Sequence, residues 1–320
     1  MKNGLNEKEV GTALELINRL SDYYDVHVIG QTRLKFTLIA GLMADGHILI
    51  ESVPGLAKTT AAKAIATAVD GSFSRIQCTP DLMPADIIGT QVYHQGTGKF
   101  ETILGPIFAN FVLLDEINRS SARTQSAMLE AMQEKAVTIA GVTYPMPADQ
   151  FTVIATQNPY EQEGTYPLAE AQKDRFMLMA KLDYPSAEEE KRILELKEKE
   201  DGRYRAVMTI EDLKTLRAIT EKVYMDDAVR TYIVRLCAET RKPEYENIRL
   251  GVSPRASIAF LKAGKAAALY DGRDYVIPED IKMLAKPVMA HRLSLSYSAR
   301  ANAVTADMVI DDILRKVPTP

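Results

Sequence analysis

The sequence has few of the residues that build transition-metal centres. Its 320 residues include only two cysteines and four histidines: Cys78, Cys237, His27, His47, His94 and His291. The cysteines lie far apart without the short spacing of metal ligands, and the histidines are scattered along the chain. We therefore expect structural or surface roles for all six side chains and no transition-metal site.

Long apolar runs are also missing. The longest, near residues 38–44, is far shorter than the roughly 18 residues that a helix needs to cross a bilayer. Residues 1–10 are polar and include Glu7 and Glu9, unlike the cationic and apolar segments of a secretory signal. The sequence thus predicts no membrane insertion and a cytoplasmic location.

No charge of one sign dominates the chain. It has 43 acidic side chains against 39 Lys and Arg, a formal net charge of -4. Proteins that hold phosphate backbones usually need a basic surface, so this balance argues against nucleic acid as the main partner. Hydrophobic residues make up 46% and charged residues 26%, which is typical of ordinary globular proteins. The length predicts one large α/β domain with a smaller companion.

The first half alternates short apolar runs with helical patterns, which is typical of βαβ units and a parallel sheet. Most of the runs are continuously apolar, as strands covered on both faces should be. They predict five strands, at residues 47–51, 73–77, 111–114, 151–156 and 176–180. Helices are predicted between them at residues 58–69, 121–134 and 168–174.

Two stretches look like insertions into this α/β pattern. Residues 92–104 predict a β-hairpin that turns at residues 95–98, and residues 135–145 predict a second that turns at residues 140–141. They are either plain surface ribbons or loops that contact a partner.

After residue 183 the pattern becomes helical. Ser186 and Glu189 form a capping-box pair at the start of a charged helix, which we interpret as a solvated connector. Further helices are predicted at residues 210–222, 227–240, 254–270 and 278–291. We therefore expect an α/β core over residues 1–183, with the two hairpins inserted, and a helical domain over residues 184–320.

A candidate phosphate loop follows the first strand. The sequence there is Ser52-Val53-Pro54-Gly55-Leu56-Ala57-Lys58-Thr59-Thr60, and a helix comes next. Free backbone N–H groups and the positive end of the helix favour an anion, Lys58 can reach the outer phosphates, and the Thr59 hydroxyl can ligate Mg²⁺. The full pattern has glycine where Ser52 and Ala57 stand, so the loop alone leaves an ordinary strand–turn–helix open.

Polar side chains also end two later strands. Asp115 and Glu116 follow the strand at residues 111–114, and such a pair is costly at a buried strand end without a cation or other partner. Asp115 can hold the metal and its water shell, and Glu116 can polarise the attacking water as the γ-phosphate leaves. Asn158 can orient the same water, although Asn158-Pro159 alone is only a turn signal. A solvent-facing acidic strand end is the alternative.

Two arginines are candidates for contact with phosphate. Arg175 precedes the last strand, where it could reach a neighbouring subunit's γ-phosphate or form an ordinary surface ion pair. Arg255 follows Ser253-Pro254 in the first turn of a helix, where the helix dipole disfavours a cation by about half a kcal/mol. A nearby anion such as bound phosphate would offset that cost.

In this order, the segments resemble an AAA+ ATPase of the MoxR family over nearly the whole chain. The blocks that carry the resemblance are Ile29-Gly30-Gln31, residues 53–59, 115–119, 124–132, 156–159 and 170–176, and Ser253-Pro254-Arg255-Ala256. The resemblance implies an α/β P-loop core with a five-stranded parallel sheet, followed by a smaller all-helical lid. It also implies a homo-oligomeric ring, usually a hexamer, with Mg-ATP between subunits. Ala57 suits the family, whereas Ser52 stands where the family usually has glycine.

The resemblance assigns roles to the residues at the strand ends. Lys58 and Thr59 correspond to the Walker A pair, and Asp115 and Glu116 correspond to Walker B. Mg²⁺ would be held by Thr59 and, through water, by Asp115. Asn158 corresponds to sensor 1.

The resemblance extends to the arginines and the base pocket. Arg175 corresponds to an arginine finger that acts in trans on the next subunit. Arg255 corresponds to sensor 2, which we expect to act from the lid on the nucleotide of its own subunit. Ile29 and Gly30 would line the adenine pocket, and the phosphate loop would be completed by Pro54, Gly55, Leu56, Ala57 and Thr60.

Family members generally remodel or mature other proteins in a chaperone-like way, sometimes for metal insertion, together with von Willebrand factor A domain partners. The resemblance therefore predicts that ATP hydrolysis acts on a client protein, and it gives weight to a partner-facing role for the hairpins. Three alternatives stay open. They are a nucleic-acid-remodelling ring ATPase, a nucleotide-gated scaffold without significant turnover, and a subunit of a metal chelatase.

Overall fold

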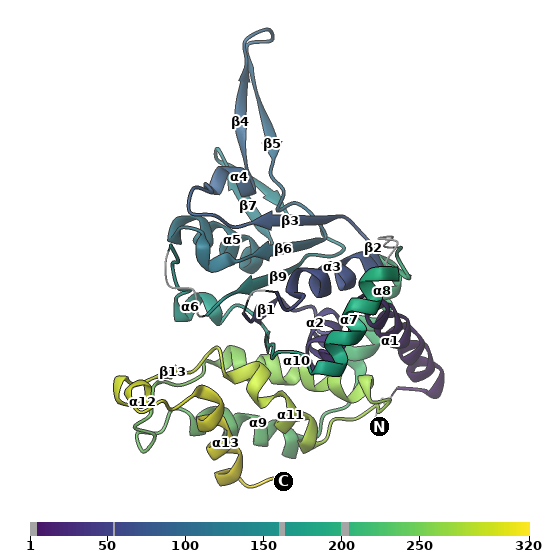
Figure 1. The fold of residues 1–320 in the computed structure, drawn as a ribbon, viewed down its shortest axis with the longest axis vertical. Coiled ribbons are helices and arrows are strands. Elements are labelled where there is room, and N and C mark those ends of the chain that lie inside the picture. The colour runs from purple at the N-terminus through teal and green to yellow at the C-terminus, as the bar shows by residue number, and fades with distance from the viewer. Residues whose placement is uncertain (1–4, 54, 160–163, 200–204) are drawn as a thin grey trace.

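The computed structural model describes residues 5–53, 55–159, 164–199 and 205–320. Its centre is a parallel five-stranded sheet in the order β10-β1-β9-β6-β3 (Figure 1). The strands are β1 (Ile48–Glu51), β3 (Phe73–Gln77), β6 (Phe111–Asp115), β9 (Thr152–Gln157) and β10 (Leu178–Lys181). The five predicted strands are confirmed, each within two residues of its expected ends.

The helices between the strands form as expected. β6 and β9 are buried along their whole length, and α3 (Lys58–Ala68) packs against both. The later helices of this part are α5 (Ala122–Glu134) and the short α6 (Glu170–Lys173). Because the central strands are covered along their length, their apolar runs show no alternation.

Two N-terminal helices have no counterpart among the predicted elements. α1 (Glu7–His27) begins at a capping box in which Asn6 and Glu9 exchange hydrogen bonds. Its buried side chains recur at helical spacing and pack against α3, while α2 (Thr32–Met43) packs against β1 and β10. α2 thus covers the sheet near its β10 end, and α1 packs outside it against α2 and α3.

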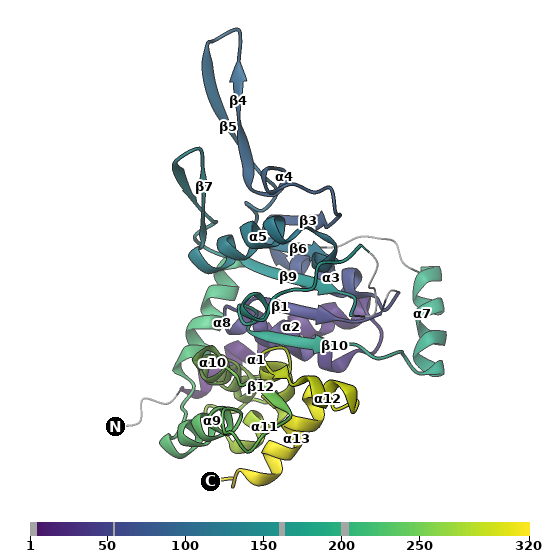
Figure 2. The ribbon, with the colours of Figure 1, turned by 90° about the vertical axis from the view of Figure 1, so that its left-hand side faces the viewer.

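Both hairpins are present. β4 (Gly89–His94) and β5 (Lys99–Leu104) form a ribbon that begins three residues earlier than predicted and extends far from the body of the molecule (Figure 1). Gly89 has a φ of 102°, and a Cβ there would lie 2.2 Å from the Ile103 carbonyl oxygen, so the base of the ribbon requires glycine. β7 (Ala136–Ile139) and β8 (Val142–Pro145) form the second hairpin. Figure 2 shows both hairpins on the side of the molecule nearest β3.

The chain after residue 184 is helical apart from short strands. Its helices are α7 (Ala187–Lys199), α8 (Ile210–Lys222), α9 (Asp227–Glu239), α10 (Pro254–Tyr270), α11 (Pro278–Met289), α12 (Tyr297–Ala301) and α13 (Ala306–Lys316). The short strands pair as β11 (Met208–Thr209) with β2 (Val69–Asp70), and β12 (Ile248–Leu250) with β13 (Ser294–Leu295).

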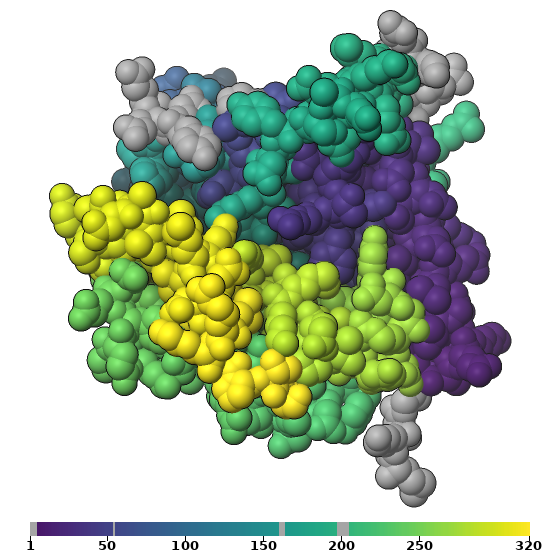
Figure 3. All heavy atoms as spheres, turned by 60° about the horizontal axis from the view of Figure 1, so that its bottom comes forward, coloured from purple at the N-terminus to yellow at the C-terminus, as the bar shows by residue number. Residues whose placement is uncertain are grey.

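These helices pack directly against the N-terminal ones. α10 contacts α1 and α2, and α8 contacts the same two helices. Figure 3 shows yellow-green atoms of the C-terminal part lying against the purple N-terminal segment. No helix in the described residues is long and apolar enough to cross a membrane.

Candidate active site

The loop between β1 and α3 has the backbone shape expected of a phosphate cradle. Gly55 and Ala57 have positive φ values of 86° and 57°, and Ala57 is the residue that caps α3. Lys58 is buried, and its Nζ donates to the Ser52 carbonyl at 3.1 Å. Pro54 lies outside the described residues. The lysine therefore lies across the loop, next to the N-terminus of α3.

Ser52 occupies the glycine position of the pattern without backbone strain. It is buried and is not among the residues with positive φ. Its N–H donates to the Gln157 carbonyl at 3.2 Å, and its hydroxyl donates to the Val53 carbonyl at 2.9 Å. A side chain is therefore tolerated at this position.

Asp115, the last residue of β6, is held by three side chains. Its Oδ1 accepts from the Thr156 hydroxyl at 2.7 Å, and its Oδ2 accepts from the Thr59 hydroxyl at 3.0 Å and from Arg75 Nη2 at 2.6 Å. Burial raises the pKa of Asp115, but the hydrogen bonds from Thr156, Arg75 and Thr59 outweigh it and lower the pKa below its ordinary value. The carboxylate therefore stays ionised at neutral pH.

The oxygen donors at this point fit Mg²⁺. Thr59 Oγ1 and Asp115 Oδ2 lie 3.0 Å apart, and both are hard ligands of the kind that Mg²⁺ takes together with water and substrate phosphates. The Arg75 guanidinium already brings a positive charge to the same carboxylate oxygen. The carboxylate oxygen can therefore pair with a cation, as its contact with the Arg75 guanidinium shows.

Glu116 extends just beyond the strand, at the start of the 3-10 turn η1 (Ile117–Arg119). The backbone of Glu116 is in the left-handed region, with a φ of 57°. This conformation costs about 1 kcal/mol or more and clusters at functional sites. Its N–H donates to the Thr156 hydroxyl at 2.8 Å. Its Oε2 accepts from Gln77 Nε2 at 3.2 Å and pairs with Arg119 at 3.3 Å. Thr156 thus holds both Asp115 and Glu116.

Asn158 directly follows β9, the strand between β1 and β6. It is buried, and its carbonyl accepts from Asn118 Nδ2 at 3.1 Å. The carboxyl ends of parallel strands meet at one edge of a sheet, so Asn158 lies between the phosphate loop and the two carboxylates. This edge brings together most of the residues that the sequence predicts for the site.

A pocket beside the phosphate loop is lined partly by α7. Ile29, Leu56 and Thr60 lie on one side of it, and Ile193 and Leu196 of α7 lie on the other. Gly30 has a φ of 69°, a left-handed conformation that favours glycine, and the Glu189 carboxylate of α7 lies against it. α7 is mostly exposed, as a solvated connector would be, but Ile193 and Leu196 also close a pocket of the kind that accepts a planar base.

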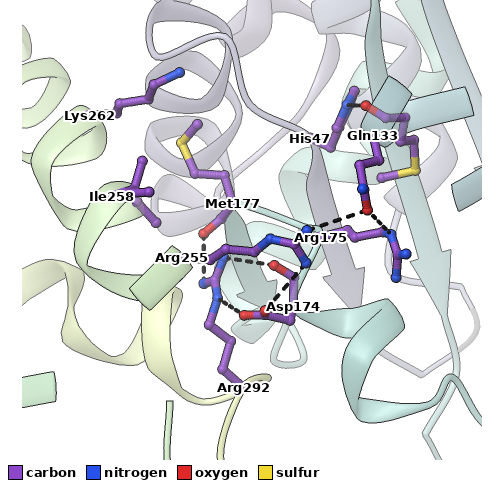
Figure 4. A pocket seen from close by; sticks show the side chains of 11 residues that line it. His47, Gln133, Asp174, Arg175, Met177, Arg255, Ile258, Lys262 and Arg292 are labelled. Carbon is purple, nitrogen blue, oxygen red and sulfur yellow. Dashed lines mark hydrogen bonds and ion pairs between the residues drawn. The ribbon is translucent and has the colours of Figure 1, made fainter. Parts of the chain in front are cut away.

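The two candidate arginines lie together in a second pocket (Figure 4). Arg175 Nε donates to Gln133 Oε1 at 3.1 Å, and Arg255 Nη2 approaches the same oxygen at 3.4 Å. Arg255 also pairs with Asp174 at 3.5 Å, and buried Arg292 pairs with that carboxylate at 3.0 Å. The two candidate arginines, from different parts of the chain, therefore line one cavity together with Arg292 and Lys262.

This second pocket lies at the opposite edge of the sheet from the phosphate loop. Arg175 precedes β10, whose first residue, Leu178, pairs with Ile48, the first residue of β1. The phosphate loop follows the other end of β1. Arg255 therefore lies with Arg175, away from the phosphate loop of its own chain, and its expected action on its own subunit's nucleotide stays a prediction for which this arrangement gives no contact. The sequence could not show this, because the position of α10 depends on packing between distant segments.

His47, in the wall of the arginine pocket, makes stability depend on pH. Its Nδ1 accepts from the Val153 N–H at 3.0 Å, which leaves Nε2–H to donate to the Met132 carbonyl at 3.2 Å. Burial lowers the pKa of His47 from 6.5 to about 4. The unfolded chain binds this proton first as the pH falls, so stability is present above pH 6.5 and declines below it.

We expect the pH drop from 7 to 5 to cost about 1–2 kcal/mol of unfolding free energy through His47. His47→Gln retains a donor and an acceptor but does not titrate, so it should flatten the dependence by that amount. Urea denaturation at several pH values measures the two slopes. Equal slopes in the two proteins would contradict this role of His47.

Several residues beside the two carboxylates and in the arginine pocket could not be predicted from the sequence. Arg75 and Gln77 of β3 reach Asp115 and Glu116 from the neighbouring strand, and Gln133 of α5 lies between the arginines. None of them belongs to a recognisable spacing pattern. Only the strand pairing identifies Gln77 as a neighbour of the carboxylates, since Gln77 is the register partner of Asp115.

A parallel sheet that carries a phosphate loop, an acidic pair and a polar residue at one edge is the architecture of a P-loop nucleotide-binding protein. The chain matches two family models: the ATPase family associated with various cellular activities (AAA) over residues 47–178, and the AAA lid domain over residues 244–313.

Similar proteins agree with this class. Chaperone MoxR1 of Mycobacterium tuberculosis is 45% identical over 300 residues, which cover 92% of this chain and 79% of MoxR1. The uncharacterized protein YeaC of Bacillus subtilis is 44% identical over 313 residues, which cover 97% of this chain and 95% of YeaC. The crystal structure of a candidate ATPase from Cytophaga hutchinsonii matches with a TM-score of 0.90 and 42% identity over 98% of both chains. The chain therefore belongs to the MoxR family of AAA+ ATPases.

Proposed function

We propose that this protein hydrolyses Mg-ATP at the subunit interfaces of a cytoplasmic ring, usually a hexamer, and thereby remodels or matures a client protein. The observation that carries the proposal is the separation of two partial sites. The phosphate loop and carboxylates lie at one edge of the sheet, and Arg175 and Arg255 lie at the other. A head-to-tail ring would join the first edge of one subunit to the second edge of the next.

Within one subunit, the residues around the phosphate loop have distinct tasks. Mg-ATP bound there would supply the phosphoanhydride bond that water cleaves and the divalent charge that stabilises the leaving phosphate. Lys58 binds the outer phosphates, and Thr59 and Asp115 hold the metal side of the nucleotide. Glu116 accepts a proton from the attacking water, and Asn158 orients that water.

The arginines act from the neighbouring subunit in this proposal. Arg175 stabilises charge on the γ-phosphate, and Arg255 joins it from the same pocket, so both act in trans. The core spans residues 1–183 and the lid spans residues 184–320, as the sequence predicts. Loss of the γ-phosphate removes these contacts, and the subunits then change their relative position. The exposed hairpin of β4 and β5 is a candidate surface for the client or for a von Willebrand factor A domain partner.

A mixed-ring experiment tests the trans arrangement. Lys58→Ala disables the phosphate loop of its own subunit. Arg175→Ala removes the arginine that its subunit contributes to the nucleotide site of the next subunit. Each variant alone should be inactive, because every interface lacks one half. An equal mixture should recover about a quarter of wild-type turnover, since about one interface in four receives both intact halves at random.

Phosphate release, measured after co-assembly over a range of protein concentrations, reports this recovery. A mixture as inactive as its two components would contradict hydrolysis between subunits. Turnover of pure Arg175→Ala at the wild-type rate would contradict the role of the finger.

A further inference from the structure

The guanidinium of Arg75 contacts Asp115, the carboxylate proposed to bind the metal. It is two residues before Gln77 on β3, and Gln77 pairs in register with Asp115 of β6, so all three side chains emerge on one face of the sheet. Arg75 Nη2 and Nε lie 2.6 and 3.2 Å from Asp115 Oδ2. This is a charge-assisted, two-donor contact with a buried carboxylate.

The oxygen that Arg75 holds is also the one that faces Thr59. Thr59 Oγ1 lies 3.0 Å from Asp115 Oδ2, and these two atoms are the metal-side donors of the site. Arginine is always charged, and two positive charges a few ångströms apart repel each other. Mg²⁺ with its water shell and the guanidinium therefore compete for one position. The Arg75 side chain is 50% exposed, so it has open space into which it can move.

Arg75 is also connected to Glu116 through one amide. Arg75 Nη2 donates to Gln77 Oε1 at 2.9 Å, and Gln77 Nε2 donates to Glu116 Oε2 at 3.2 Å. Arginine only donates and an ionised carboxylate only accepts, so the two partners together fix which way the amide points. Without Arg75, only the carboxylate of Glu116 itself still orients the amide nitrogen towards Glu116.

We infer that Arg75 is an internal cation that competes with Mg²⁺ for Asp115 and, through Gln77, restrains Glu116 until Mg-nucleotide displaces it. Arg75 is thus a positioning residue that acts through the two carboxylates. The inference rests on the proposed function, because it requires Mg-nucleotide to bind between Thr59 and Asp115. In the nucleotide-free chain, the guanidinium keeps the metal-binding carboxylate neutralised and the general base held. Metal binding removes the influence of Arg75 from both, and Glu116 keeps its pair with Arg119.

The metal dependence of nucleotide affinity tests the competition. Binding of N-methylanthraniloyl-ADP is titrated in EDTA and in excess Mg²⁺. The dissociation constant in EDTA is divided by the dissociation constant in Mg²⁺, and this ratio is compared between proteins. In Arg75→Met the ratio should rise about tenfold, because Mg²⁺ displaces no cation and metal-free ADP faces an unscreened Asp115. ADP removes any contribution from turnover.

Two further variants control this ratio. Arg75→Lys keeps a cation near Asp115 and should stay within about threefold of wild type. Arg230→Met removes an exposed arginine on α9 and should match wild type. An unchanged ratio in Arg75→Met would overturn the inference and leave the proposed ATPase intact. A wild-type protein that bound no nucleotide would overturn both.

A double-mutant cycle tests the connection to Glu116. In EDTA, the effects of Arg75→Met and Glu116→Gln on the urea unfolding midpoint should not add, because Gln77 joins the two residues. In saturating Mg-ADP the same effects should add, because Arg75 has left Asp115. Additivity in EDTA, or equal coupling in both conditions, would overturn this part of the inference.

Discussion

Replacing Glu116 with glutamine is expected to lower ATP turnover about a thousandfold, because a neutral amide cannot accept the proton of the attacking water. Glutamine has the shape of glutamate, and the Glu116 N–H still donates to the Thr156 hydroxyl. The phosphate loop, with Lys58 and Thr59, is untouched. ATP binding should therefore change little. Phosphate release at saturating Mg-ATP and titration with a fluorescent ATP analogue measure the two effects separately.

Glu244→Gln is the matched control, because it makes the same chemical change at an exposed position away from the sheet edge. It should behave as wild type. If Glu116→Gln retained turnover within tenfold of wild type, the proton acceptor would have to be another group. If it lost nucleotide binding as well, the loss of turnover would report a damaged site and not a missing base.

The sheet could be predicted from the sequence because its central strands are buried along their whole length. Such strands form continuous apolar runs, and the run at 111–114 ends where two carboxylates begin. Lys58-Thr59 and Asp115-Glu116 are likewise local patterns that a short segment contains in full. Parallel strands then bring these segments to one edge, so the core of the candidate site follows from strand order alone.

The helices that cover the sheet were harder to predict. The capping pair Asn6 and Glu9 does mark the start of α1, but the polar character of the first residues concealed the buried stripe that follows. α7 is rich in charge, and the few apolar side chains that close the base pocket look ordinary in sequence. What these helices cover depends on tertiary contacts, and local propensity does not determine those.

Side chains that contact a neighbouring strand or a packed helix leave no pattern in the sequence. Arg75 and Gln77 reach the carboxylates only because β3 lies next to β6. Arg255 was assigned correctly as a cation near the first turn of a helix, yet its neighbours are Asp174 and Gln133 and not the phosphate loop of its own chain. The register of one strand pair and the docking of α10 supply what the sequence could not.

Arg175→Ala is expected to lower turnover at least about a thousandfold while leaving nucleotide binding to a single subunit unchanged. Arg175 lies at the edge of the sheet opposite its own phosphate loop, so its removal cannot weaken contacts within the subunit's own nucleotide site. In the proposed ring, it removes the planar, two-donor cation that would stabilise charge on a neighbour's γ-phosphate. Arg175→Lys should restore little, because a point charge on a flexible stem does not reproduce that geometry.

Turnover and nucleotide affinity, measured together at low and high protein concentration, distinguish this role from a structural one. A structural arginine would affect stability and affinity as well, because its contacts with Gln133 and the Ala171 carbonyl would be lost in every state of the protein. Arg230→Ala, an exposed arginine on α9, controls for the loss of surface charge. A fall in affinity that matched the fall in turnover would mean that Arg175 supports the fold of its own subunit. A fall confined to turnover at assembling concentrations would assign the arginine to the neighbouring site, because only an assembled interface can present it there.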